Sequence, residues 1–74
     1  MNIREKIKEL AKEALGAELS EEEDLRESGV DSLGLVSLIV AVEEEFGLTF
    51  RDDDLQPERL RTLGDLTELT EKYQ

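Results

Sequence analysis

Apolar residues recur at the three-to-four-residue spacing of an amphipathic helix in several stretches of the chain. The first stretch covers residues 2–15, with apolar positions at Ile3, Ile7, Leu10, Ala14 and Leu15. Asn2 is a good helix cap at its start, and Gly16 tolerates the left-handed conformation that ends helices. We therefore predict a first helix over about residues 2–15.

A second helix is predicted from Asp31 or Ser32 to about Phe46, with Gly47 ending it. One face carries Leu35, Leu38, Ile39, Val42 and Phe46, and this is the expected core face. A second apolar stripe, made of Leu33, Val36 and Val40, lies roughly 100 to 160° around the helix. Glu44 and Glu43 lie on the two flanks of this stripe.

The second stripe has two interpretations. A central helix buried on two sides carries two apolar stripes, and burial against the other helices accounts for the pattern. A partly exposed stripe rimmed by acids is instead typical of a surface that receives partners. The pattern alone does not choose between burial and docking.

Residues 16–31 show no sustained period and are expected to form a long loop. Ser20 followed by Glu23 resembles a capping box, which predicts a short turn. Apolar residues within this loop are expected to pin it to the core: Leu19, Leu25 and Val30.

The last third of the chain predicts one short and one longer helix. A short helix is expected near Pro57 to Leu60, with an earlier turn at Asp52 to Leu55. Thr62 caps the final helix, with Asp65 in the third position and a buried stripe of Leu63, Leu66, Leu69 and Tyr73. The expected fold is all-α: a small four-helix bundle of three main helices plus a short third one, as a single domain over residues 1–74.

The amino-acid composition and net charge exclude several kinds of site and partner. The chain has no cysteine and no histidine, which excludes disulfides, a thiolate nucleophile, serine–histidine catalysis and the usual zinc ligands. A formal net charge of −11 argues against nucleic acid and anionic membranes and favours basic protein partners. Without an apolar run of membrane-spanning length or a signal-peptide pattern, we expect a soluble, cytoplasmic protein, and the initial methionine suggests a stand-alone chain.

Three consecutive acids, Asp52, Asp53 and Asp54, raise the alternative of a metal site. Consecutive side chains cannot all converge on one ion, and the glycine and spacing of a calcium loop are absent. The sequence therefore predicts no metal site.

Ser32 is the position with the clearest chemical interest. Asp31 already suits the cap, which leaves Ser32 at the first helical position with its hydroxyl facing solvent. The unpaired N–H groups and positive dipole end of a helix N-terminus suit a phosphate. A serine at a helix start is also very common, so an acidic interaction module with an unmodified serine remains an alternative.

The motif "GVDSL" at residues 29–33, the continuation "LVSLIVAVEEEFG" and the closing "TLGDL" together resemble the acyl carrier protein family. The resemblance implies that Ser32 carries 4′-phosphopantetheine, donated by coenzyme A and attached by a phosphopantetheinyl transferase. Cargo then rides on the arm as a thioester, and the protein is a monomeric tether rather than an enzyme.

The resemblance also implies which residues partner enzymes recognise. These partners are acyl-transferring, adenylating or condensing enzymes with basic docking surfaces. The residues expected to meet them are Asp31, Leu33, Val36, Val40, Glu43 and Glu44.

Two positions depart from the pattern of fatty-acid carriers. Gly34 and Ser37 stand where those carriers usually have acids. The departure favours a discrete carrier in polyketide or nonribosomal peptide biosynthesis, with fatty-acid synthesis as the alternative.

Overall fold

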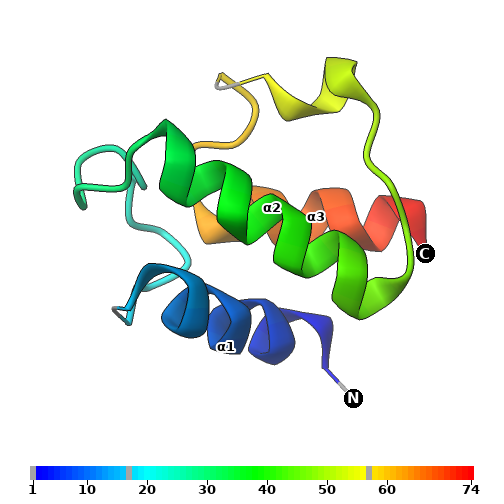
Figure 1. Cartoon of the computed structure of the whole chain (residues 1–74), viewed down its shortest axis with the longest axis horizontal. Coiled ribbons are helices and arrows are strands. Elements are labelled where there is room, and N and C mark those ends of the chain that lie inside the picture. The colour runs from blue at the N-terminus through cyan, green and yellow to red at the C-terminus, as the bar shows by residue number, and fades with distance from the viewer. Residues whose placement is uncertain (1, 17, 57) are drawn as a thin grey trace.

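The computed structural model describes residues 2–16, 18–56 and 58–74, and no β-strand occurs within these ranges. The elements are α1 (Ile3–Leu15), α2 (Ser32–Phe46), the short 3₁₀ helix η1 (Asp52–Leu55) and α3 (Leu63–Tyr73). Figure 1 shows α1 alongside α2, α3 crossing behind α2, and the chain after α2 passing along the side of α2 away from α1. The predicted all-α class with three main helices is confirmed.

Hydrogen-bonded caps place the helix ends where the sequence predicts them. At the start of α2, the backbone N–H of Gly34 donates to Asp31 Oδ1 at 2.8 Å. Gly47 ends α2 with φ of +65°, in the left-handed region that favours glycine. Thr62 and Asp65 form a reciprocal capping box at the start of α3. These contacts satisfy backbone groups that a helix cannot pair within itself.

The core lies between the three main helices, and α1 packs against both α2 and α3. From α2, Leu38 and Val42 are completely buried, as the predicted core face requires. The other buried apolar residues are Ile7, Leu10, Ala11, Leu25, Ile39, Phe50, Leu60, Leu63 and Leu66. Burial of this apolar surface is the main favourable term in folding.

Two buried threonines were not predicted. Thr67 and Thr70 are almost completely buried in α3. Their hydroxyls donate to the backbone carbonyls of Leu63 at 3.0 Å and Leu66 at 2.8 Å. Because each hydroxyl is paired within its own helix, both side chains can face the core without an unsatisfied polar group.

The loop between α1 and α2 is pinned as expected. Leu25 is buried, Leu19 and Val30 pack against the core, and the Leu25 N–H donates to the Arg61 carbonyl at 2.8 Å. A turn forms at residues 21–22, but the Glu23 carboxylate accepts a hydrogen bond from Ser28 Oγ at 2.9 Å. The predicted capping box is therefore replaced by a contact within the loop.

The short helical element lies earlier than its predicted position. Within the expected stretch Pro57 to Leu60, residues 58–59 form a turn, and Pro57 itself lies outside the described residues. The N–H groups of Arg59 and Leu60 both donate to the Gln56 carbonyl, at 2.8 and 3.2 Å. The 3₁₀ helix η1 instead occupies Asp52–Leu55, where the sequence predicts only a turn.

Tyr73 at the end of α3 holds the segment that contains η1. Its hydroxyl donates to Asp54 Oδ2 at 2.6 Å and accepts from the Arg51 backbone N–H at 2.9 Å. Its ring packs edge-on against Phe50, with the ring centroids 5.1 Å apart. The hydrogen bond from Tyr73 lowers the pKa of Asp54, and the same bond raises the pKa of Tyr73.

Replacing Tyr73 by phenylalanine should lower the melting temperature most within a defined pH window. Asp54 has a lowered pKa, so its contribution is present above its ordinary 3.8 and is lost as pH falls through the lowered value. Tyr73 has a raised pKa, so its contribution is present below 10.0 and is lost as pH rises through the raised value. The difference between the circular-dichroism melts of the two proteins should narrow at both pH extremes, where the hydrogen bond from the Arg51 N–H to Tyr73 still distinguishes them. A constant difference at every pH would contradict this assignment.

Candidate functional site

Ser32 is exposed at the first position of α2. The turn before it is fixed by two backbone hydrogen bonds, from Gly29 N–H to the Arg26 carbonyl and from Val30 N–H to the Leu25 carbonyl. Gly29 has φ of +93°, which side chains rarely tolerate, so glycine is needed where the loop reverses into α2. The helix cap is made by Asp31, as predicted, and the Ser32 hydroxyl is not required for it.

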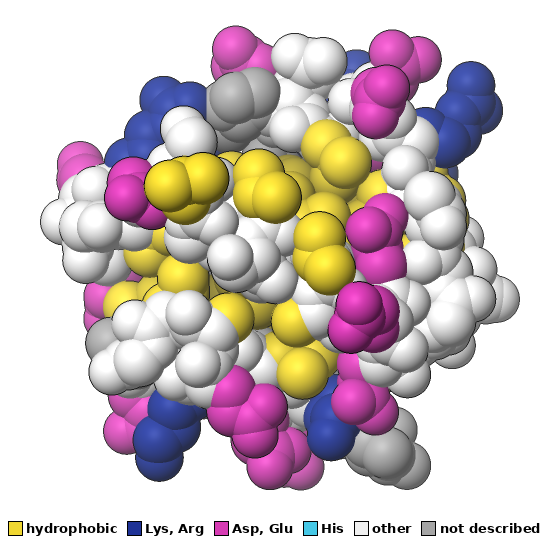
Figure 2. All heavy atoms as spheres, in the orientation of Figure 1, with side chains coloured by type: hydrophobic (Ala, Val, Ile, Leu, Met, Phe, Trp, Pro, Cys, Tyr) yellow, Lys and Arg dark blue, Asp and Glu magenta, His cyan; other side chains and the backbone are white. Residues whose placement is uncertain are grey.

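The second apolar stripe of α2 lies at the surface. Leu33 is 78% exposed, Val36 55% and Val40 44%, whereas Leu38 and Val42 on the core face are 0% exposed. Figure 2 shows apolar side chains gathered on this face of the molecule, with acidic side chains around them. We call Leu33, Val36 and Val40 the docking stripe. The sequence left two interpretations of this stripe, and the one in which other helices bury it is wrong.

The two acids beside the docking stripe differ in their surroundings. Glu44 is exposed, whereas Glu43 is half-buried. One carboxylate oxygen of Glu43 accepts a hydrogen bond from the Phe50 backbone N–H at 2.8 Å. Glu43 therefore ties the chain after α2 back onto the helix, an internal role that the sequence did not reveal.

A pocket of about 740 Å³ lies between α2 and the segment that contains η1. Ser32 and Arg26 line one part of it, and Val36 and Val40 of the docking stripe line another. The remaining lining residues are Leu25, Val30, Asp31, Leu35, Ile39, Glu43, Thr49, Phe50, Asp52, Leu55 and Leu60. Sequence reasoning missed this pocket, because its outer wall is the segment without a clear helical period.

The absence of a side chain at Gly34 has a structural explanation. A Cβ atom at this position would lie 3.0 Å from Leu15 Cδ2 and 3.4 Å from Val30 Cγ1. The end of α1 and the loop therefore approach α2 closely here, and the missing side chain makes room for them. Ser37, the other departure from fatty-acid carriers, is exposed.

In the part of the chain that the structure describes, no three acidic side chains are placed to hold a metal ion. None of the helices in the described ranges is long and apolar enough to span a membrane.

Comparison with known proteins identifies the family of the chain. A family model described as a phosphopantetheine attachment site matches residues 5–70. An acyl carrier protein of Nitratidesulfovibrio vulgaris is 40% identical over 60 residues, covering 76% of this chain and 79% of the relative. An acyl carrier protein of Saccharopolyspora erythraea is 43% identical over 72 residues, covering 92% of this chain and 74% of the relative. This chain therefore belongs to the acyl carrier protein family, whose members are carriers rather than catalysts and bear covalently attached 4′-phosphopantetheine.

Proposed function

We propose that Ser32 is the attachment site for 4′-phosphopantetheine and that residues 1–74 act as one carrier domain. The observation that carries the proposal is the exposed Ser32 at the first position of α2, with Asp31 already making the cap. A primary hydroxyl fits a phosphodiester linkage. The neighbouring helix N-terminus favours the added negative charge through its unpaired N–H groups and its dipole.

The chain's own residues limit what it contributes to attachment. Ser32 Oγ loses its proton as it bonds to the phosphorus that bears the arm in coenzyme A, while the pyrophosphate bond of coenzyme A breaks and adenosine 3′,5′-bisphosphate leaves. The chain has no histidine to accept that proton near neutral pH. The phosphopantetheinyl transferase must therefore supply the base, while this chain supplies an accessible, fixed hydroxyl. The bound arm supplies a thiol for acyl, aminoacyl or ketide cargo, which a chain without cysteine cannot supply itself.

The docking stripe and Glu44 form the surface that partner enzymes recognise under this proposal. Three exposed apolar side chains on successive turns of one helix suit an apolar patch on a partner. Glu44 can pair with a basic side chain at the rim of that patch, where charged groups chiefly raise the association rate. Partners with basic docking surfaces, the transferase and the acyl-transferring, adenylating or condensing enzymes, fit this arrangement.

The pathway we favour is polyketide or nonribosomal peptide biosynthesis, with the chain as a discrete carrier. Support comes from α2, which carries no acid from Ser32 until Glu43. Gly34 and Ser37 leave the first half of the helix without the acids typical of fatty-acid carriers. Fatty-acid synthesis is the alternative, and the enzyme that loads cargo onto the modified protein distinguishes the two.

Ser32→Ala should abolish attachment of the arm. Incubation with coenzyme A and a broad-specificity phosphopantetheinyl transferase should add one arm to the native chain and none to this variant, as measured by intact mass. The matched controls are Ser28→Ala and Ser37→Ala, which remove exposed hydroxyls on either side and should accept one arm. An arm on Ser32→Ala would overturn the assignment, and an unmodified native chain would favour the interaction module.

Val40→Asp should separate docking from folding. Val40 is 44% exposed, so the new carboxylate stays hydrated and the melting curve should change little. Loading by the transferase should fall about tenfold or more, because a charge replaces an apolar contact within the docking stripe. The control Val42→Asp places the same carboxylate at a fully buried position and should cost several kcal/mol of stability.

Circular-dichroism melting and loading rate, measured on the same preparations, decide the outcome. Native loading by a folded Val40→Asp protein would reject the docking role, as would unfolding of that variant. Glu44→Lys should slow loading chiefly through the association rate, and its effect should shrink as salt rises.

A further inference from the structure

Arg26 is the only basic residue between positions 13 and 50. It is exposed, and it takes part in none of the ion pairs found in the described ranges. Those pairs join Arg4 to Glu21, Lys6 to Glu45, Arg59 to Asp54 and Arg61 to Asp24. Lys8, Lys12, Arg51 and Lys72 are also outside these pairs, so the feature that distinguishes Arg26 is its position.

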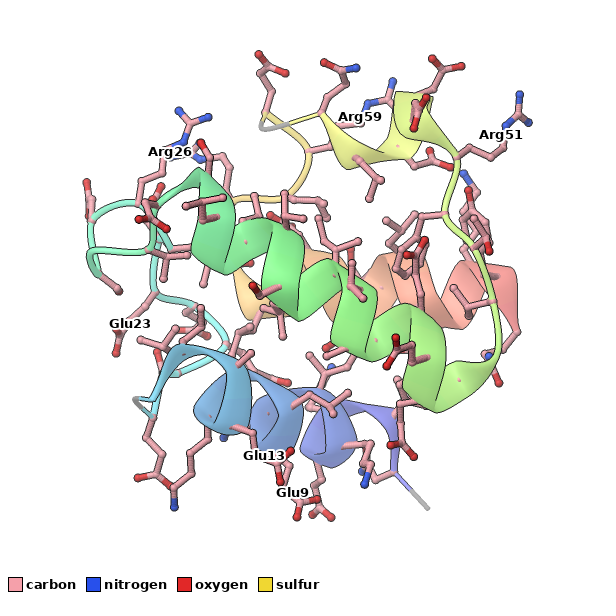
Figure 3. All side chains as sticks on the ribbon, in the orientation of Figure 1. Glu9, Glu13, Glu23, Arg26, Arg51 and Arg59 are labelled. Atoms are coloured by element: carbon pink, nitrogen blue, oxygen red, sulfur yellow. The ribbon has the colours of Figure 1, made fainter. Side chains whose placement is uncertain are left out.

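The position of Arg26 relates it to Ser32. Both side chains line the 740 Å³ pocket, and Arg26 is the only base among its lining residues. Figure 3 shows Arg26 beside the N-terminal end of α2. Its backbone is fixed on both sides, since its N–H donates to Asp24 Oδ1 at 2.9 Å and its carbonyl accepts from Gly29 N–H at 3.1 Å. Arg26 therefore extends from a fixed turn and lines the pocket that Ser32 also lines. It also lines a second, smaller pocket together with Asp24, Glu58 and Arg61.

Modification of Ser32 would place two negative charges at the start of α2, and Arg26 is the nearby cation that can offset them. A phosphodiester on Ser32 carries one negative charge and is adjacent to Asp31. The Asp31 carboxylate caps the helix through the Gly34 N–H and cannot move away without losing that bond. The dipole of α2 offsets part of the repulsion. A guanidinium is suited to offset the remaining repulsion, since its planar N–H groups match phosphate oxygens.

We propose that Arg26 binds the phosphodiester of the arm on Ser32, and that it thereby acts as a positioning residue for that arm. The proposal rests on the proposed function of Ser32. It identifies Arg26 as a contact of the modified protein itself, independent of any partner enzyme.

A thermodynamic cycle between arm and side chain tests this contact. Melting temperatures are measured for the unmodified and the arm-bearing forms of three proteins: native, Arg26→Gln and Arg51→Gln. Arg51 is the matched control, because it is also exposed and outside the four ion pairs, but does not line the pocket. Figure 3 shows it on the chain after α2, away from Arg26. Each unmodified form is its own reference, so effects of a substitution on the fold alone cancel.

Attachment of the arm should lower the melting temperature of Arg26→Gln by a few degrees more than that of the native protein or Arg51→Gln. The extra loss should shrink as salt rises. Arg26→Lys, which keeps the charge without the planar guanidinium, should fall between native and Arg26→Gln. The ³¹P chemical shift of the arm should move in Arg26→Gln and stay unchanged in Arg51→Gln.

Equal changes in all three proteins would overturn the proposal. Equal extra loss in Arg26→Gln and Arg51→Gln would also overturn it, because general charge would then be the cause. Slow loading of Arg26→Gln, without the extra loss of melting temperature in the loaded variant, would overturn the proposal and assign Arg26 to transferase docking. A native chain that accepts no arm contradicts the proposed function of Ser32 and is recognised before any variant is compared.

Discussion

Leu38 and Val42 are the points at which α2 enters the core, and both are completely buried. Their burial fixes the rotation of α2 about its axis. Because a helix places residues about 100° apart, that rotation turns Leu33, Val36 and Val40 to the surface. The chain is short and has no further helix to cover them within the described ranges. The exposed stripe is thus a consequence of how the core is packed.

The start of α2 joins this packing to the proposed chemistry. Gly29 and the buried Leu25 determine how the loop arrives at Asp31, and Asp31 begins the helix. Ser32 is then presented at the same end of α2 as Leu33. A partner that covers the docking stripe is therefore also close to the hydroxyl. Under the proposed function, this proximity brings the hydroxyl to the enzyme that attaches the arm, and the arm then supplies the thiol that the chain lacks.

Periodicity and capping residues predicted both ends of the first two main helices and the start of the last one, since both signals are local. They could not decide the environment of the second stripe, because an apolar stripe looks the same whether other helices cover it or not. Exposure of Val36 and Val40 follows only from the arrangement of α1, α3 and the chain after α2.

The remaining differences from prediction also come from tertiary contacts. Glu43 was interpreted as a flanking acid, but its bond to the Phe50 N–H depends on where the chain folds back. Thr67 and Thr70 are polar in sequence, and their pairing within α3 makes them suitable for the core. Gly34 was interpreted only as a departure from fatty-acid carriers, and its close approach to Leu15 is visible only in three dimensions.

Recognition of the exposed side of α2 by partner enzymes can be measured by titrating the isotope-labelled chain with a phosphopantetheinyl transferase and following the amide chemical shifts. If partners bind this side, the largest changes fall on Ser32, Leu33, Val36, Val40 and Glu44. Changes concentrated on the outer faces of α1 or α3, with α2 unaffected, would contradict this mode of recognition.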